Sequence, residues 1–293
     1  MEEFNQNTAP IAKENKGKPY LMAAAKIIAF LIIMLIVSGV FSALLMVLVN
    51  LSPVFGGWVL FHYLQEIAML IGTCVSAYII LCHWEKLPFI SLGLSIKGRG
   101  KDIFWGGMVA FALYAIGFGI LWMLGEIRVI KVGFDLGGLV LSWGLMLLVA
   151  ITEEICVRGF VLGRLLNSGM NKYLALFLSA FLFSILHLFN PNFSMLPFIN
   201  ILLAGLLLGF MYIYTRNLWF PISLHLFWNW LQGPVLGFEV SGADFDKTLL
   251  TLNLPTKSIL NGGDFGFEGS IICTVLIAIL IGVLWFTQHR RKE

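Results

Sequence analysis

Residues 149–160 read VAITEEICVRGF, and they place two adjacent glutamates and an arginine inside an otherwise apolar run. Glu154 and Arg158 are four residues apart, so on a helix they lie on one face in the order that favours an ion pair. Glu153 points about 100° away and gains no partner from that pair. A carboxylate in an apolar, membrane-like setting is a functional candidate, and it can act as a general base on water.

Two later apolar stretches supply further polar groups at matching depth. FLFSILHLFN contains His187, and LWFPISLHLFWNW contains His225 and Asn229 four residues apart. Counted from the nearest basic residues at 1.5 Å per residue, these side chains and Glu153 lie roughly 13–22 Å along their helices. Three helices would therefore bring a carboxylate, two imidazoles and an amide together near the membrane midplane, as helical bundles do at internal sites.

This set of side chains supports two chemistries, and the spacing does not decide between them. A glutamate or histidine can take a proton from water, while a histidine and an asparagine amide donate hydrogen bonds to the oxyanion of a tetrahedral intermediate. Glu153, His187 and His225 would equally supply three ligands to a divalent metal such as Zn²⁺, with an open position for water. The sequence contains neither an HExxH motif nor a glycine-flanked serine elbow.

The composition indicates which elements must position these residues. Of the 293 residues, 59% are hydrophobic and 12% are charged, and the mean hydropathy is +0.91. Soluble domains have about 45–50% apolar and about 25% charged residues, so we expect an integral membrane protein. The short alternating segments of a β-barrel are absent. The sequence predicts an all-α polytopic membrane helical bundle with about eight transmembrane helices: 22–49, 58–83, 103–124, 137–163, 172–189, 194–215, 218–236 and 269–287.

The basic residues predict the orientation of this bundle. With the N-terminus assigned to the cytoplasm, 15 of the 19 basic residues fall on the cytoplasmic side, which is the expected bias. We therefore expect a multi-pass protein of the cell membrane with both termini cytoplasmic. The predicted organisation is a polar cytoplasmic N-terminus (1–20), three N-terminal helices (21–136), a four-helix core (137–236), an outer loop (237–268), and a last helix with a basic tail (269–293).

Other intramembrane polar and small residues have structural interpretations. His62 and Glu66 lie close to the outer end of the second predicted helix, where water and head groups can satisfy them. Gly205 and Gly209 form a small-xxx-small pattern that permits close helix packing. The outer loop 237–268 either covers the outer face or moves freely.

Three motifs together resemble a known family. EEICVR, FSILH and HLFWN match, in order, the patterns EExxxR, FxxxH and HxxxN of the CPBP intramembrane proteases. That family includes the type II CAAX prenyl proteases and the Abi proteins linked to bacteriocin processing and self-immunity. The resemblance covers about residues 137–236; outside them the chain is similar only in being hydrophobic.

The resemblance implies an endopeptidase with its site inside the membrane. By the family's pattern, Glu153 and His187 would activate water, and His225 and Asn229 would form the oxyanion hole. Glu154 and Arg158 would support them. Members have been described both as metalloproteases and as glutamate-dependent enzymes, so the need for a metal stays open. The partners it implies are the lipid bilayer and a membrane-associated peptide or protein, for CAAX-type processing or bacteriocin maturation, and no nucleic acid.

Two other functions use the same polar cluster. A proton-coupled transporter would show inverted repeats and broken helices in matching positions, and neither is apparent. A non-catalytic immunity or scaffold protein would keep the cluster for structural reasons alone. The charge pattern favours substrate access from the cytoplasm, whereas the depth of His187 leaves the side of access open.

Overall fold

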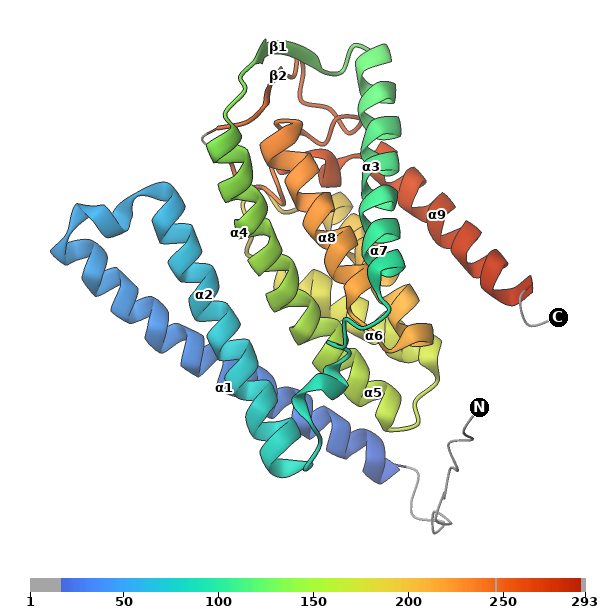
Figure 1. The fold of residues 1–293 in the computed structure, drawn as a ribbon. Coiled ribbons are helices and arrows are strands. Elements are labelled where there is room, and N and C mark those ends of the chain that lie inside the picture. Colours follow the sequence, from blue (N-terminus) through green and yellow to red (C-terminus); the bar gives the residue numbers. More distant parts are fainter. Residues whose placement is uncertain (1–16, 246, 291–293) are drawn as a thin grey trace.

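The computed structural model describes residues 17–245 and 247–290; the predicted polar N-terminus up to residue 16 and the last three residues of the basic tail lie outside them. The described chain is mostly helical, which confirms the all-α membrane bundle (Figure 1). The α-helices are α1 (Gly17–Leu51), α2 (Trp58–Ala77), α3 (Gly100–Met123), α4 (Leu136–Glu154), α5 (Gly163–Asn167), α6 (Lys172–Leu186), α7 (Met195–Thr215), α8 (Trp219–Trp230) and α9 (Ile271–Arg290).

Shorter elements extend or connect these helices. Three π-helical segments continue α2, α4 and α8 without a break: η2 (Tyr78–Trp84), η4 (Ile155–Leu162) and η5 (Leu231–Val235). Single 3₁₀ turns are η1 (Pro53–Gly56), η3 (Phe89–Leu92), η6 (Gly263–Phe265) and η7 (Phe267–Gly269). Strands β1 (Arg128–Val132) and β2 (Leu250–Asn253) form one antiparallel pair.

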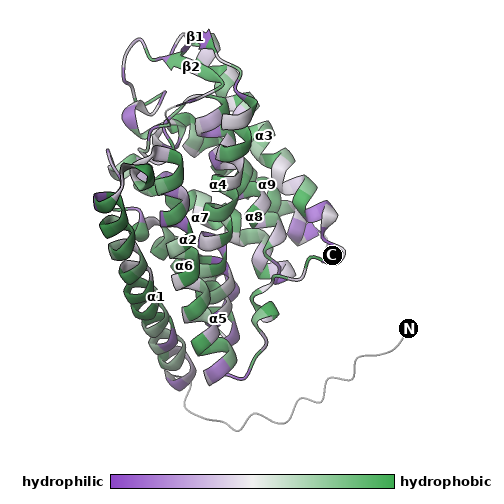
Figure 2. Ribbon diagram, turned by 60° about the vertical axis from the view of Figure 1, so that its left-hand side comes forward, coloured by the Kyte–Doolittle hydropathy of each residue, from purple (hydrophilic) through white to green (hydrophobic). Residues whose placement is uncertain are grey.

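Each predicted membrane segment coincides with a helix or with a helix and its π-helical extension. By length and hydropathy, six of the described helical segments can cross a membrane; α6, with 15 residues, is shorter. At 1.5 Å per residue α6 is about 22 Å long, short of a hydrocarbon core of about 30 Å. The predicted end of this segment at residue 189 is wrong, because the helix ends at Leu186 and His187 caps it. Figure 2 shows hydrophobic residues along most of the helices' length and many of the hydrophilic ones towards their ends.

Small residues let the core helices approach one another. A Cβ atom on Gly106 of α3 would lie 2.6 Å from the Phe220 carbonyl oxygen of α8. A Cβ atom on Gly205 of α7 would lie 2.9 Å from the Ala180 Cβ of α6. Both distances are shorter than real side chains allow, so glycine is required at both positions. For Gly205 this is the close packing that the small-xxx-small pattern predicts.

An ionic cluster attaches the α1–α2 hairpin to the core at one end of the bundle. Lys26 Nζ lies 2.6 Å from Glu85 Oε1, and Arg164 contacts the other oxygen of the same carboxylate. The three charges come from α1, the end of η2 and α5, so one glutamate joins three separate elements.

The start of α4 is fixed by its cap. Asp135 accepts a hydrogen bond from the Gly138 backbone N–H at 3.0 Å, which satisfies one free donor of the first turn. That bond, with a further contribution from Lys247, lowers the pKa of Asp135 below its ordinary value of 3.8. The cap determines where α4 begins, and so how far along it Glu153 lies.

Candidate active site

The predicted ion pair of α4 and η4 is confirmed. Arg158 Nη1 donates to Glu154 Oε1 at 2.7 Å, and both side chains are at most 1% exposed. Arg158 also donates from Nη2 to the Gly205 carbonyl at 3.3 Å, and its guanidinium carbon lies 4.3 Å from the centre of the Phe183 ring. Charges buried in this way persist when they are paired and hydrogen-bonded. The pair therefore connects α4 to both α6 and α7.

His225 of α8 lies between the two glutamates of the motif. Its Nδ1 is 2.9 Å from Glu154 Oε1, and its Nε2 is 3.8 Å from Glu153 Oε2. Because Glu154 is paired with Arg158, its ionised carboxylate can only accept, so Nδ1 of His225 carries a proton. This bond fixes the ring orientation and directs Nε2 towards Glu153.

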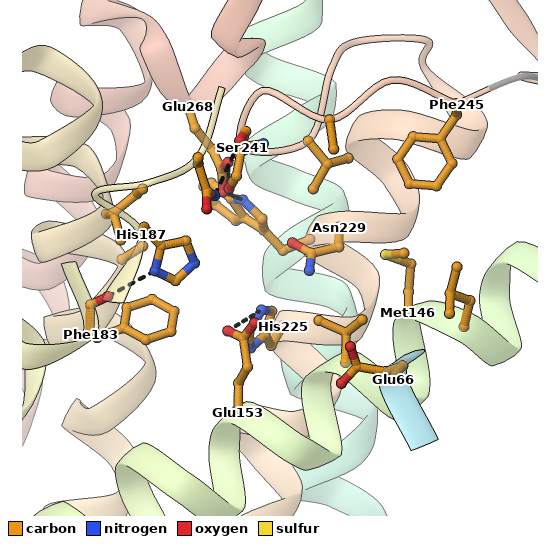
Figure 3. Close-up of a pocket in the computed structure, with 18 of the residues that line it drawn as sticks. Glu66, Met146, Glu153, Phe183, His187, His225, Asn229, Ser241, Phe245 and Glu268 are labelled. Carbon is orange, nitrogen blue, oxygen red and sulfur yellow. Dashed lines mark hydrogen bonds and ion pairs between the residues drawn. The ribbon is translucent and has the colours of Figure 1, made fainter. Parts of the chain in front are cut away.

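His187 is held by the residue that begins its own motif. Its Nδ1 donates to the Phe183 carbonyl at 2.8 Å, because a carbonyl oxygen can only accept. The Phe183 ring also packs against His187 at 4.7 Å and edge-on against His225 at 6.2 Å, as measured between ring centroids. One aromatic side chain thus positions Arg158 and both histidines, which explains why phenylalanine begins the FxxxH pattern. With Nδ1 so occupied, Nε2 is the free ring nitrogen of His187 (Figure 3).

The four candidate catalytic residues line a single cavity of about 290 Å³ (Figure 3). They are Glu153 from α4, His187 at the end of α6, and His225 and Asn229 one turn apart on α8. Glu153 is 32% exposed, and its Oε2 atom has no hydrogen-bond partner among the described residues. Glu154 and Arg158 do not line the cavity and lie behind it. The two adjacent glutamates therefore differ: one is committed to a structural pair, and the other is free to act on water.

The three-ligand metal site that the sequence also allows is not formed by the described residues. Glu153, His187 and His225 share the cavity, yet no group of three His, Cys, Asp or Glu side chains in the described ranges is placed to hold a metal ion. As positioned, these three side chains do not fit a three-ligand metal centre.

The motif-bearing segment also matches a family model. Residues 135–231 match the model described as Type II CAAX prenyl endopeptidase Rce1-like. The match starts at the N-cap of α4 and ends at the C-cap of α8, so it contains all three motifs. This core is therefore similar to the type II CAAX prenyl endopeptidases over about a third of the chain. No curated protein and no solved structure matches the chain.

The resemblance expected from the three motifs is thus confirmed, and the chain is a multi-pass membrane protein whose core is similar to that of the CAAX-type intramembrane endopeptidases. Residues outside the matched segment also line the cavity, among them His62 and Glu66 of α2. Sequence reasoning assigned both to the membrane interface, whereas Glu66 lies close enough to Glu153 and His225 to interact electrostatically with each. The sequence feature that could have identified them as site residues is their spacing of four residues on one face of an apolar helix.

One rim of this cavity is formed by a segment anchored through Glu268, a residue not identified from sequence. The buried Glu268 carboxylate accepts hydrogen bonds from Trp228 Nε1 at 2.8 Å, and from the backbone N–H and hydroxyl of Ser241 at 3.0 and 2.6 Å. Gln232 Nε2 lies 3.3 Å from the same carboxylate. These bonds hold the described residues 238–245 against α8. Part of the predicted outer loop therefore borders the site.

Proposed function

We propose that the chain is an intramembrane endopeptidase that hydrolyses a peptide bond of a membrane-associated peptide or protein. Glu153, His187, His225 and Asn229 are its catalytic residues, and Glu154 and Arg158 position His225. One observation carries this proposal: four polar groups from three helices line one cavity, and the Glu153 carboxylate among them has an unpartnered oxygen.

Glu153 and His187 activate the attacking water molecule. The ionised Glu153 carboxylate takes one proton from a water molecule in the cavity, acting as general base. The unprotonated Nε2 of His187 accepts the other water proton as a hydrogen bond and orients the oxygen. The resulting hydroxide attacks the peptide carbonyl carbon, and the carbonyl π electrons move to oxygen to give a tetrahedral oxyanion.

His225 and Asn229 stabilise the oxyanion. The Asn229 side-chain amide donates one hydrogen bond, and His225 donates from Nε2 when its ring is an imidazolium. In that state the charges of Glu153, Glu154, Arg158 and His225 sum to zero. Neutral clusters are favoured where water is scarce, so the two glutamates support the donating form of His225.

Collapse of the intermediate completes the hydrolysis. The carbonyl re-forms, the C–N bond breaks, and the proton held by Glu153 passes to the leaving nitrogen. The products are one new carboxylic acid and one new amine, and transfer of a proton from the acid to the amine gives their ionised forms. Bacteriocin maturation and CAAX-type processing both require cleavage of a peptide bond, so the same site chemistry would serve either.

The orientation proposed with this function follows from charge. One end of the bundle is rich in basic residues, including Lys86, Lys97, Lys172 and Arg216. In the proposed orientation this end faces the cytoplasm, and so do both termini.

The proposal is tested with purified protein and a library of membrane-spanning peptides in ¹⁸O-labelled water. Cleavage with one ¹⁸O in the new carboxyl group is expected, and it is lost in Glu153→Gln. If a folded wild-type protein cleaves nothing, and Glu153→Gln keeps the cellular phenotype, the non-catalytic immunity or scaffold function replaces the protease.

A further inference from the structure

The two ends of the bundle differ in the segments that they carry. The loop face comprises the described segments 52–57, 124–135, 187–194 and 236–270, including β1 and β2 (Figure 1). The basic face comprises 85–99, 168–171 and 216–218. Chain connectivity places these two sets at opposite ends of the helices.

The active-site cavity extends towards the loop face. Its lining includes Trp58 and His62 from the first turns of α2 and Asn190 from the turn after α6. It also includes residues 240, 241 and 243–245 of the segment held by Glu268. None of the described side chains that line it comes from the basic-face segments. His187 lies at the loop-face end of α6, so the catalytic histidine itself marks this direction.

The cavity is closed towards the basic face. Beyond Glu154 the chain continues as η4, and all eight residues Ile155–Leu162 are buried. Within this buried segment, Arg158 contacts Phe183 of α6 and Gly205 of α7. A packed turn with a buried, paired arginine leaves no route for a peptide.

The charges identify which side of the membrane each face occupies. On the loop face, Lys247 pairs with Asp135 at 3.3 Å and Lys257 with Asp264 at 2.6 Å, and Asp244 adds a further acidic group. The basic residues of the loop face are Arg128, Lys131, Lys247 and Lys257. The basic face and the helix ends beside it carry twice as many: Lys18, Lys86, Lys97, Arg99, Lys101, Arg164, Lys172 and Arg216. By the positive-inside bias, the loop face is the non-cytoplasmic one.

We infer that the protease takes its substrate from the non-cytoplasmic side, through the mouth formed by α2 and residues 240–245. This inference rests on the proposed function and gives its substrate class: a peptide segment that reaches the outer leaflet or outer surface. The expectation of cytoplasmic access is replaced. At the mouth, the Trp58 and Phe245 rings lie 5.5 Å apart, and Asp244 is exposed beside them.

The walls of this passage indicate what the substrate must present. Apolar side chains of α4 and α7, including Met146, Val149 and Leu208, line one side of the cavity, and the carboxylates of Glu66 and Asp244 lie on others. A peptide with apolar side chains near its cleaved bond fits this lining, because such side chains leave water on entering the cavity.

Cysteine labelling tests the inference without relying on activity. Single variants Asp244→Cys at the mouth, Thr251→Cys on the same face and Lys97→Cys on the basic face are made in a background lacking the partly exposed Cys74 and Cys82. Intact cells are treated with a membrane-impermeant maleimide, with and without permeabilisation. Purified variants are then labelled with a polymer-linked maleimide, and cleavage of a library-derived peptide is measured.

The inference predicts that the Asp244 and Thr251 variants are labelled in intact cells and the Lys97 variant only after permeabilisation. The polymer on the Asp244 variant lowers cleavage roughly tenfold or more, because a blocked mouth prevents productive binding, and the polymer on the Thr251 variant leaves it unchanged. Labelling of the Lys97 variant alone in intact cells overturns the inference, and so does undiminished cleavage by the labelled Asp244 variant. A lack of cleavage in the unlabelled protein, whatever the labelling pattern, instead overturns the proposed function and the inference with it.

Discussion

Replacing Arg158 by methionine removes a charge from the most buried part of the site. Methionine keeps much of the arginine's length and apolar volume, so the change isolates the guanidinium. The variant loses the 2.7 Å contact to Glu154, the hydrogen bond to the Gly205 carbonyl and the position over Phe183. Glu154 stays buried, and its remaining partner is His225.

The expected loss is large because the remaining carboxylate cannot reach water. Removing one partner of a buried ion pair lowers the free energy of unfolding by about 3–5 kcal/mol. The free energy is measured by titrating purified protein in mixed detergent micelles with a denaturing detergent, with tryptophan fluorescence as the signal. Arg99→Met serves as the matched control, since the partly exposed Arg99–Asp102 pair is worth roughly 0–1 kcal/mol.

A double variant distinguishes the ion pair from simple packing loss. In Glu154→Gln/Arg158→Met no charge of the pair is left buried, so the combined loss is smaller than the sum of the two single losses. The reasoning is refuted if Arg158→Met is no more destabilising than Arg99→Met, or if the two single losses add.

Three further predictions concern packing, capping and the cavity rim. Gly205→Val forces α6 and α7 apart and lowers the free energy of unfolding by about 1–3 kcal/mol. Gly39→Val is the control, because the space around its Cβ position is open and the substitution causes no such loss. The same denaturant titration measures both variants, and equal free energies of unfolding contradict the packing argument. Asp135→Ala lowers the melting temperature at pH 7. Because the folded-state pKa of Asp135 is depressed, its stabilisation is full above the ordinary value of 3.8 and is lost as pH falls through the lowered pKa; a difference between wild type and variant that does not shrink in acid contradicts this. Glu268→Ala releases residues 238–245, so added protease cuts there faster than in wild type, and an unchanged cutting rate argues against the anchoring role.

The sequence was sufficient for those features that depend on local spacing. The Glu154–Arg158 pair follows from four residues on one helix, and the separation of Glu153 from that pair follows from the helical angle. The apolar runs located the helices to within a few residues, because a membrane leaves the backbone few alternatives.

Features that depend on how helices rotate and tilt could not be predicted. The contact of His225 with Glu154, and the packing of Phe183 between Arg158 and the two histidines, depend on the rotation of α6 and α8 about their axes. Glu66 was misjudged because depth counted along one helix does not show which neighbouring helix its side chain faces. The hydrogen bonds of the Glu268 carboxylate join residues up to 40 positions apart, so no local sequence pattern predicts them.

Cleavage by purified Glu153→Gln beside Glu126→Gln, each with and without a chelator, tests the central claim most directly. Glu126 lies after α3 and bonds with Ser258 and Asn261, so its variant controls for loss of a carboxylate elsewhere. The account predicts that Glu153→Gln lowers the rate roughly 10²–10⁴-fold while remaining folded, as loss of a general base does. It also predicts that Glu126→Gln and the chelator have no effect on the rate. If a folded Glu153→Gln protein cleaves the peptide at the wild-type rate, Glu153 is not the general base.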